Sequence, residues 1–281
     1  QTVGADGENT EVRFRRFNAS GAALDAEDQR IYTERPGNHW LLDLACGADG
    51  GFVASAVRPS GITAGFEVFA QRYNAAGDTI GDPVEVAPGA ASQIFPRVAV
   101  AGTGAYVVAW EDSETLDSNA KTLARVFDRP GTTDLLVTVA GDAISASQGA
   151  LVAADPDGTF VLGGFQAGLR LQHLDGDTLT PMLWPESVAT AVTQGALVGL
   201  GGDRFAAVYY TGTSSNTQAK VAYFDGASAD GEALTTDTGR FTLAYQPAID
   251  YANGRLVAAW TESLSTPENT AFTIHLALFT D

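Results

Sequence analysis

The stretch RVAVAGTGAYVVAWE, residues 97–111, decides the fold class of this 281-residue chain. It holds two apolar segments separated by the turn Gly102-Thr103-Gly104, and glycine tolerates the positive φ values that tight hairpin turns demand. The second segment, residues 105–111, is an almost unbroken run of strand-forming residues, which is typical of a strand buried on both faces. The stretch therefore predicts a β-hairpin whose second strand is deeply buried.

The same hairpin pattern recurs five times along the chain. Anchored on the second residue of each buried strand, the copies are 54, 54, 45 and 51 residues apart. A short turn and an earlier apolar strand precede each copy. The buried second strands are predicted at residues 51–57, 105–111, 159–165, 204–210 and 255–261, and the first strands at 41–45, 97–101, 150–154, 196–200 and 248–251.

Two further strands follow each of these hairpins, except at the C-terminus, where only one follows. The third strand ends in a turn in which Asn or Asp precedes Gly, as at residues 74–77, and a fourth strand comes after it. Four antiparallel strands repeated about every 50 residues are typical of propeller blades, which bury their faces by packing in a ring. The third strands are predicted at residues 67–74, 122–128, 169–175, 220–225 and 273–281, and the fourth at 83–86, 135–139, 178–183 and 232–236.

We therefore predict an all-β chain that forms a single β-propeller of five four-stranded blades over residues 11–281, after a disordered tail at residues 1–10. Both termini are expected to build one composite closing blade, in which residues 30–33 give the fourth strand and the C-terminus gives the other three. The segment at residues 11–18 also matches a third strand, so it is surplus, and its role in ring closure stays open. A pair of β-sandwiches is the alternative fold, but a repeat through the whole chain argues against it.

Composition excludes several classes of partner. The chain has 34 acidic and 16 basic residues, a formal net charge of -18, and such a field repels the phosphates of nucleic acids. We expect no membrane insertion, because no apolar run approaches the ~20 residues that span a bilayer. The single cysteine, Cys46, excludes an intrachain disulfide and is expected to be a small buried residue. A start at Gln1 without Met predicts a processed, secreted or cell-surface protein.

A motif pattern accompanies the repeat. It consists of Gln-Pro-x-Val/Ile before the turn, Phe/Leu-Val-x-Ala-Trp after it, and a third strand that ends in Arg-Tyr/Phe-Asn/Asp. The chain matches it at residues 246–249 with 256–260, at 96–100 with 106–110, and at 71–74. This pattern resembles the propeller-forming repeats of bacterial secreted proteins, although Gly164 and Tyr209 replace the Trp in two copies. The resemblance implies a secreted scaffold of adhesin-like or calcium-associated exoproteins, and it implies no reaction.

The residues directly before the first strands are expected to ring one mouth of the propeller channel, with aromatic residues from the ends of second strands nearby. Amide side chains both donate and accept hydrogen bonds, and aromatic faces stack on the apolar faces of sugars. We therefore predict a non-catalytic binding or adhesion module for a small polar ligand or glycan. Each residue has a structural alternative, since Gln can bond backbone groups between blades and Trp can pack on the next blade. The candidates are His39, Gln148, Gln194, Gln246, Trp110, Tyr209 and Trp260, with Phe95 in the same ring.

A glycoside-active hydrolase is the alternative function, and it needs two suitably spaced carboxylates. The candidates are Asp43 and Asp250, at equivalent places on first strands of neighbouring blades, with Glu111 or Glu262 on the rim. A third hypothesis is a structural spacer within a larger exoprotein.

We expect no cofactor. The three histidines, His39, His173 and His275, have no metal-ligand spacing, and the chain has no nucleophile elbow or P-loop. Weak surface calcium at Asp-rich turns, such as residues 155–158, stays an open alternative.

Overall fold

A computed structural model of the protein describes most of the chain. The described residues are 2–3, 10–31, 40–59, 65–87, 92–113, 121–128, 135–138, 150–165, 169–175, 178–181, 194–213, 216–225, 228–235, 247–266 and 269–280. Every regular element among them is a strand, so the chain is all-β, as predicted. Within these residues there is no helix of the length and apolarity needed to cross a membrane.

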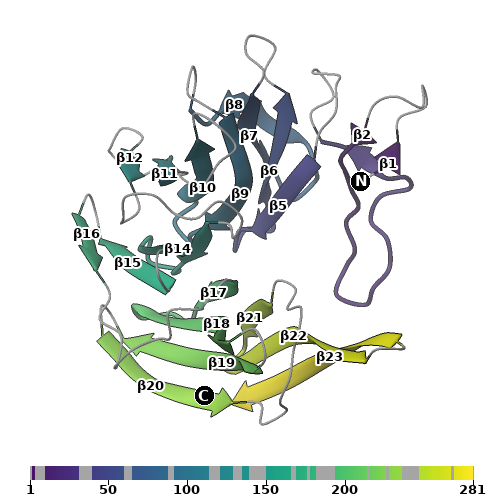
Figure 1. The fold of residues 1–281 in the computed structure, drawn as a ribbon. Coiled ribbons are helices and arrows are strands. Elements are labelled where there is room, and N and C mark those ends of the chain that lie inside the picture. The colour runs from purple at the N-terminus through teal and green to yellow at the C-terminus, as the bar shows by residue number, and fades with distance from the viewer. Residues whose placement is uncertain are drawn as a thin grey trace.

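Five antiparallel sheets follow one another along the chain, and we number them I to V (Figure 1). Sheet I holds β5 (Trp40–Cys46), β6 (Phe52–Pro59), β7 (Phe66–Tyr73) and β8 (Thr79–Glu85). Sheet II holds β9 (Ser92–Val100), β10 (Tyr106–Ser113), β11 (Lys121–Phe127) and β12 (Leu135–Thr138). Sheet III holds β13 (Leu151–Ala154), β14 (Phe160–Phe165), β15 (Leu169–Asp175) and β16 (Thr178–Pro181).

Sheet IV holds β17 (Gly195–Gly199), β18 (Arg204–Thr213), β19 (Asn216–Asp225) and β20 (Ser228–Thr235). Sheet V holds β21 (Ala248–Ala252), β22 (Arg255–Thr266) and β23 (Asn269–Thr280). In Figure 1 the five sheets follow an arc, from sheet I at the top through sheet III at the left to sheet V at the lower right. The predicted order of strands within each unit is therefore observed in sheets I to IV.

Neighbouring sheets pack on each other through separate apolar clusters. Trp110 of sheet II belongs to one cluster with Val57 and Val68 of sheet I, and Phe160 of sheet III belongs to another with Val107 of sheet II. Because alternate residues of a strand point to opposite faces, the second strand of each of sheets II to IV contributes to two clusters. The other two junctions are built from Leu171, Phe205, Ala207 and Tyr209 between sheets III and IV, and from Val208, Tyr210, Val221, Leu256 and Trp260 between sheets IV and V.

A chain of polar contacts joins the turns of sheets III and IV. Asp203 stands where the corresponding turns have Gly50, Gly104 and Gly158, and it keeps their left-handed backbone, with a φ of 65°. The buried Asp155 carboxylate accepts a hydrogen bond from the Asp203 backbone N–H at 2.5 Å. The Asp203 carboxylate in turn lies 2.7 Å from Nε2 of His173 on β15. These contacts hold a non-glycine residue in a conformation that disfavours side chains.

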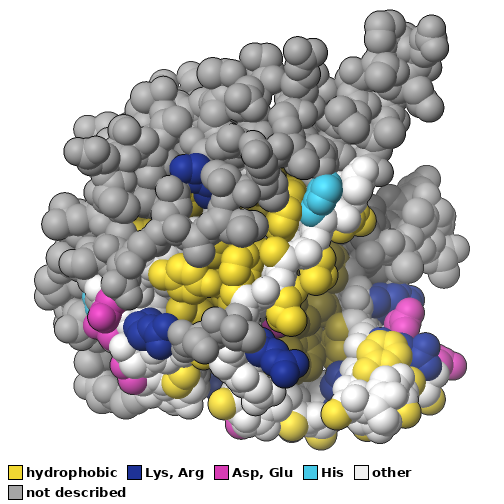
Figure 2. Space-filling model, turned by 90° about the horizontal axis from the view of Figure 1, so that it is seen from below, with side chains coloured by type: hydrophobic (Ala, Val, Ile, Leu, Met, Phe, Trp, Pro, Cys, Tyr) yellow, Lys and Arg dark blue, Asp and Glu magenta, His cyan; other side chains and the backbone are white. Residues whose placement is uncertain are grey.

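Sheet V leaves one face of its last strand open. Three large aliphatic side chains that alternate along β23 are exposed: Ile274 (78%), Leu276 (68%) and Leu278 (57%). Figure 2, a view from below Figure 1, shows hydrophobic side chains gathered on this underside of the molecule. The opposite face of the sheet, with Ala277 and Phe279, packs on sheet IV.

The N-terminal segment, residues 10–31, covers the face of sheet I that sheet II does not. It contains β2 (Thr10–Glu11), which pairs with β1 (Thr2–Val3), and β3 (Arg13–Phe14), which pairs with β4 (Gln29–Arg30). Its Phe14 ring lies 4.9 Å from Phe52 and 5.1 Å from Tyr73, measured between ring centroids.

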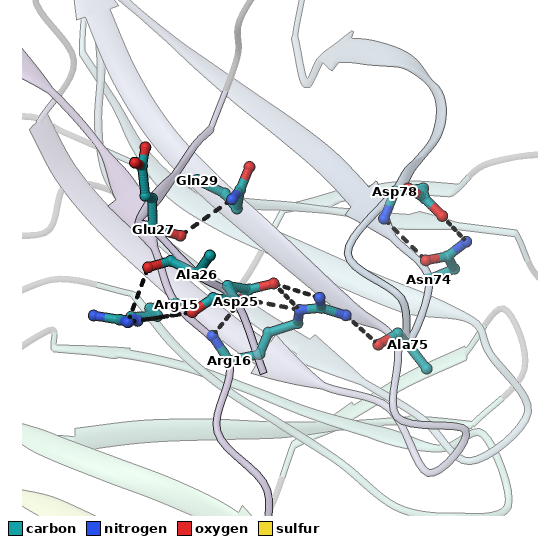
Figure 3. A network of polar contacts seen from close by, with 9 residues as sticks. All are labelled: Arg15, Arg16, Asp25, Ala26, Glu27, Gln29, Asn74, Ala75 and Asp78. Atoms are coloured by element: carbon teal, nitrogen blue, oxygen red, sulfur yellow. Dashed lines mark hydrogen bonds and ion pairs between the residues drawn. The ribbon is translucent and has the colours of Figure 1, made fainter. Parts of the chain in front are cut away.

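Polar contacts fasten this segment to the turn between β7 and β8 (Figure 3). The Arg16 guanidinium donates to the Asp25 carboxylate through Nε at 3.0 Å and through Nη2, and its Nη1 donates to the Ala75 carbonyl at 2.6 Å. Asn74 and Asp78 close the turn through two further hydrogen bonds. The segment is therefore bound to sheet I by both apolar and polar groups.

The predicted composite blade is not observed. Residues 30–33 were expected to add a fourth strand beside the C-terminal three, but β4 pairs with β3 instead, and residues 32–33 lie outside the described part of the chain. Among the described strands, β23 is the edge of a three-stranded sheet V. The cause is burial, because Val12 and Ile31, at 1% and 5% exposure, are enclosed against sheet I. The surplus segment at residues 11–18 thus supplies β3 and part of this cover.

Candidate functional site

The first strands of all five sheets surround one central cavity of about 500 Å³. In sequence, its lining residues come shortly after the positions that were predicted to ring the channel mouth. Of those positions, His39, Gln148 and Gln246 lie outside the described residues. The lining consists of Leu42, Asp43, Leu44, Arg97, Val98, Leu151, Val152, Gly195, Ala196, Leu197, Pro247, Ala248 and Ile249.

Gln194 and Phe95 border this lining in sequence. Gln194 is half-buried, and its side-chain oxygen is enclosed without a hydrogen-bond partner among the described residues. Phe95 has a φ of 52°, which is unusual for an aromatic residue, at the point where a bulge shifts the register of β9 against β10. This bulge comes two residues before Arg97, the next charged residue on β9.

Asp43 is the acidic residue of the cavity. It is half-buried on β5, and its Oδ2 accepts a hydrogen bond from the Val98 backbone N–H at 2.8 Å. Burial raises the pKa of the Asp43 carboxyl, against the opposing effects of the nearby Arg97 charge and of backbone N–H groups. The cavity lining therefore includes a carboxyl and a guanidinium whose charges interact, surrounded mainly by aliphatic side chains.

Arg97 is a site residue that the repeat pattern alone did not reveal. Strand register explains its position, because Asp43 pairs with Ser55 and Arg97 with Ala109, each three residues beyond the anchor of its second strand. The two residues thus occupy equivalent places on neighbouring sheets. The pair could have been found in the sequence by counting the same number of residues back along each first strand from its glycine turn.

Asp250 does not join Asp43. It pairs with Val257, one residue beyond its anchor, so the two acids differ by two positions, or about 7 Å along a strand. The prediction that they occupy equivalent places was wrong. Asp250 is exposed, its Oδ1 accepts a hydrogen bond from the Tyr251 N–H at 2.8 Å, and it is not part of the cavity lining.

The aromatic candidates lie in the junctions between sheets. Trp110, Tyr209 and Trp260 are 0%, 2% and 6% exposed, so they do not offer an aromatic face to a ligand in this structure. Trp260 stacks on His275 with ring centroids 5.6 Å apart. Their structural alternative, packing on the next sheet, is the arrangement observed.

Glu111, Glu262 and Cys46 are the remaining residues that the sequence analysis singled out. Glu111 is fully buried in β10, while the side chain of Glu262, which lies in β22, is outside the described part of the structure. Cys46 was expected to be buried but is exposed, because the side of β5 that carries Leu42, Leu44 and Cys46 packs on none of the described sheets. Burial of its sulfur by neighbouring atoms and the charge of Asp250 raise the pKa of the Cys46 thiol.

Metal ligands do not gather in the described part of the chain. No group of three or more His, Cys, Asp or Glu side chains there is arranged to hold a metal ion. His173 is instead engaged with Asp203, and the Asp157 carboxylate accepts from the Thr159 N–H at 3.1 Å within its own turn.

Comparison with solved structures identifies similar folds. A polysaccharide lyase, Uly1, matches with a TM-score of 0.54 at 11% identity over 94% of this chain and 64% of its own. A mutant of the Aleuria aurantia lectin AAL in complex with Fucα1-6GlcNAc matches with a TM-score of 0.51 at 13% identity over 95% of this chain and 91% of its own. A Dyadobacter fermentans protein of unknown function matches with a TM-score of 0.52 at 9% identity over 86% and 79%. No protein-family model and no curated protein matches the chain.

Proposed function

We propose that this protein is a secreted, bacterial, five-bladed propeller that binds a small polar ligand or glycan in its central cavity, as a binding or adhesion module without catalysis. The cavity carries this proposal. It collects residues from the first strands of all five sheets, and it combines an aliphatic lining with one carboxyl and one guanidinium group. Concave sites that are mostly apolar, with a few placed polar groups, are typical of small-ligand sites.

Asp43 and Arg97 give the cavity its capacity for hydrogen bonds. A ligand hydroxyl can donate to the Asp43 carboxylate, and a ligand oxygen can accept from the Arg97 guanidinium. Such bonds are charge-assisted, which makes them stronger than hydrogen bonds between neutral groups. The lectin, which was solved with a fucosylated glycan, has a similar fold. This similarity of fold supports a glycan as the class of ligand.

A glycoside hydrolase is the weaker proposal because the cavity lining holds one acid among the residues that the structure describes. The second acid of the predicted pair, Asp250, lies two register positions away and outside the lining, and Glu111 is enclosed between strands. Glycoside hydrolysis in most families needs an acid and a second carboxylate on either side of the scissile bond.

A glycan array followed by thermal-shift titration of the hits tests the binding proposal, and Asp43→Asn and Asp250→Asn form a matched pair of variants. We expect Asp43→Asn to weaken binding by about tenfold or more, since a charge-assisted hydrogen bond contributes ~1.5–3 kcal/mol. Asp250→Asn should bind as the wild type does. Equal affinity of both variants for every hit would place the ligand elsewhere.

The same variants separate binding from catalysis. The wild-type protein should release no product from glycosides that it binds. Glycoside cleavage by the wild type that disappears in the Asp43→Asn/Asp250→Asn double variant would establish the hydrolase instead. Cleavage that persists in the double variant would remove these two acids from any catalytic role.

A further inference from the structure

The side of β23 that is exposed corresponds to a side of the third strand that is buried in each of sheets I to IV. Strand register aligns Leu276 with Ala70, Ala124, Leu171 and Val221, because each pairs three residues beyond the anchor of its second strand. The four equivalents are between 0% and 3% exposed, against 68% for Leu276. Ile274, 78% exposed, likewise aligns with Val68, Thr122 and Ala219, which are at most 4% exposed.

In the other sheets this face packs on the second strand of the following sheet. Val68 and Ala70, for example, contact the cluster that contains Tyr106, Val108 and Trp110. The exposed face of β23 therefore carries apolar side chains like those that pack between neighbouring sheets, but no described sheet packs on it. The matching surface on sheet I, formed by Phe52, Ala54 and Ala56, is already covered by the N-terminal segment.

We propose that this face is an interface between two copies of the chain, each packing its β23 face on that of the other. Three observations select a second copy. The row Ile274, Leu276, Leu278 is self-complementary, since a two-fold axis at Leu276 sets Ile274 against Leu278 of the other copy and Leu276 against itself.

The second observation is charge. Residues 269–280, NTAFTIHLALFT, contain no Asp, Glu, Lys or Arg, whereas the whole chain has a net charge of -18. Two such chains repel each other over most of their surfaces, whereas β23 itself contributes no charged side chain to a contact. The third observation is contiguity, because the three aliphatic side chains alternate along one strand and form one exposed apolar row, and contiguous apolar patches mark interaction surfaces.

Sedimentation velocity over a concentration series tests the interface, with Leu276→Lys as the variant and Leu24→Lys as its matched control. Leu24 is also an exposed leucine, at 57%, but lies in the N-terminal segment. We expect the wild type and Leu24→Lys to dimerise and Leu276→Lys to raise the dimer dissociation constant about tenfold or more, because a lysine would then be buried in each copy. Dimerisation of the wild type should strengthen as added salt screens the net charge.

Cysteine variants give a second readout that does not require a charge in the interface. In a Cys46→Ser background, Leu276→Cys should form an intermolecular disulfide when diamide is added as the two-electron oxidant, because the two-fold axis places the two thiols side by side. Leu24→Cys in the same background should form none under these conditions.

A wild type that stays monomeric at every concentration would overturn the proposal. Thiol labelling of Leu276→Cys then measures how accessible the face is in the monomer. Fast labelling would mean that the face is open to solvent, and slow labelling would mean that another part of the same chain covers it.

Discussion

At the scale of single residues, substitutions within the repeat show where this chain departs from its own pattern. Asp155 stands where sheets II and IV have Ala101 and Leu200, and it is completely buried. One of its carboxylate oxygens accepts from Asp203 N–H, and the other has no hydrogen-bond partner among the described residues. Asp203 thus replaces the glycine of the turn, and its backbone is held by a hydrogen bond to the Asp155 carboxylate. Burying this carboxylate is unfavourable when it is charged.

Burial raises the pKa of Asp155, the backbone N–H of Asp203 opposes this shift, and the charges of Asp157 and Asp203 add to it. A group with a raised folded-state pKa contributes stability that is present below its unfolded pKa and lost as the pH rises through the folded one. Asp155→Asn should therefore be at least as stable as the wild type at pH 7, since the amide oxygen still accepts from Asp203. The advantage should vanish as the pH falls towards about 4.

Urea unfolding of both proteins across this pH range measures the effect on the free energy of unfolding. Asp82→Asn, at an exposed aspartate on β8 that is not among the groups acting on Asp155, is the control for removing a charge from the surface. A destabilisation by Asp155→Asn that is the same at every pH would show that the carboxylate is needed for its bonds, whatever its charge.

At the scale of elements, the sequence predicts what depends on neighbours along the chain. Glycine turns and buried second strands fix each hairpin, so the strands of sheets I to IV are found within a few residues of the expected bounds. The sequence does not predict which distant surface the N-terminal segment covers. That choice depends on Phe14 finding Phe52 and Tyr73 across the sheet, and no local pattern encodes this contact.

The functional residues divide in the same way. The position of the cavity follows from the order of strands, and its lining includes Asp43, which was a candidate only for the alternative hydrolase function. Trp110, Tyr209 and Trp260 were predicted near the channel because they lie at the ends of apolar strands. Such positions also face the next sheet, and burying a large aromatic ring there is more favourable than exposing it to solvent. Strand register, rather than similarity of sequence, separates Asp43 from Asp250.

Trp110→Ala tests the structural role of these aromatic residues. Because Trp110 is fully buried between sheets I and II, its removal should lower the free energy of unfolding by ~3–5 kcal/mol. Phe17→Ala, at a residue that is 58% exposed, should change it by less than about 0.5 kcal/mol. A Trp110→Ala variant with wild-type stability and lost ligand binding would contradict the burial and restore the ligand-contact hypothesis.

At the scale of the whole molecule, five sheets contribute one strand each to a single cavity, and this arrangement is the centre of the account. Each sheet is joined to the next by its own cluster, so the cavity exists only while all four junctions hold. The cavity and the face of β23 are the two surfaces, among the described residues, that we propose as contact sites for partners.

Titration of the best array ligand into two tryptophan variants of β21 tests this account most directly. Ala248 and Ala252 are both exposed alanines on that strand, but Ala248 lines the cavity and Ala252 does not. We predict that Ala248→Trp fills the cavity and abolishes binding while the protein stays folded, and that Ala252→Trp binds with wild-type affinity. Equal binding by both variants would show that the ligand does not enter the central cavity and would contradict the account.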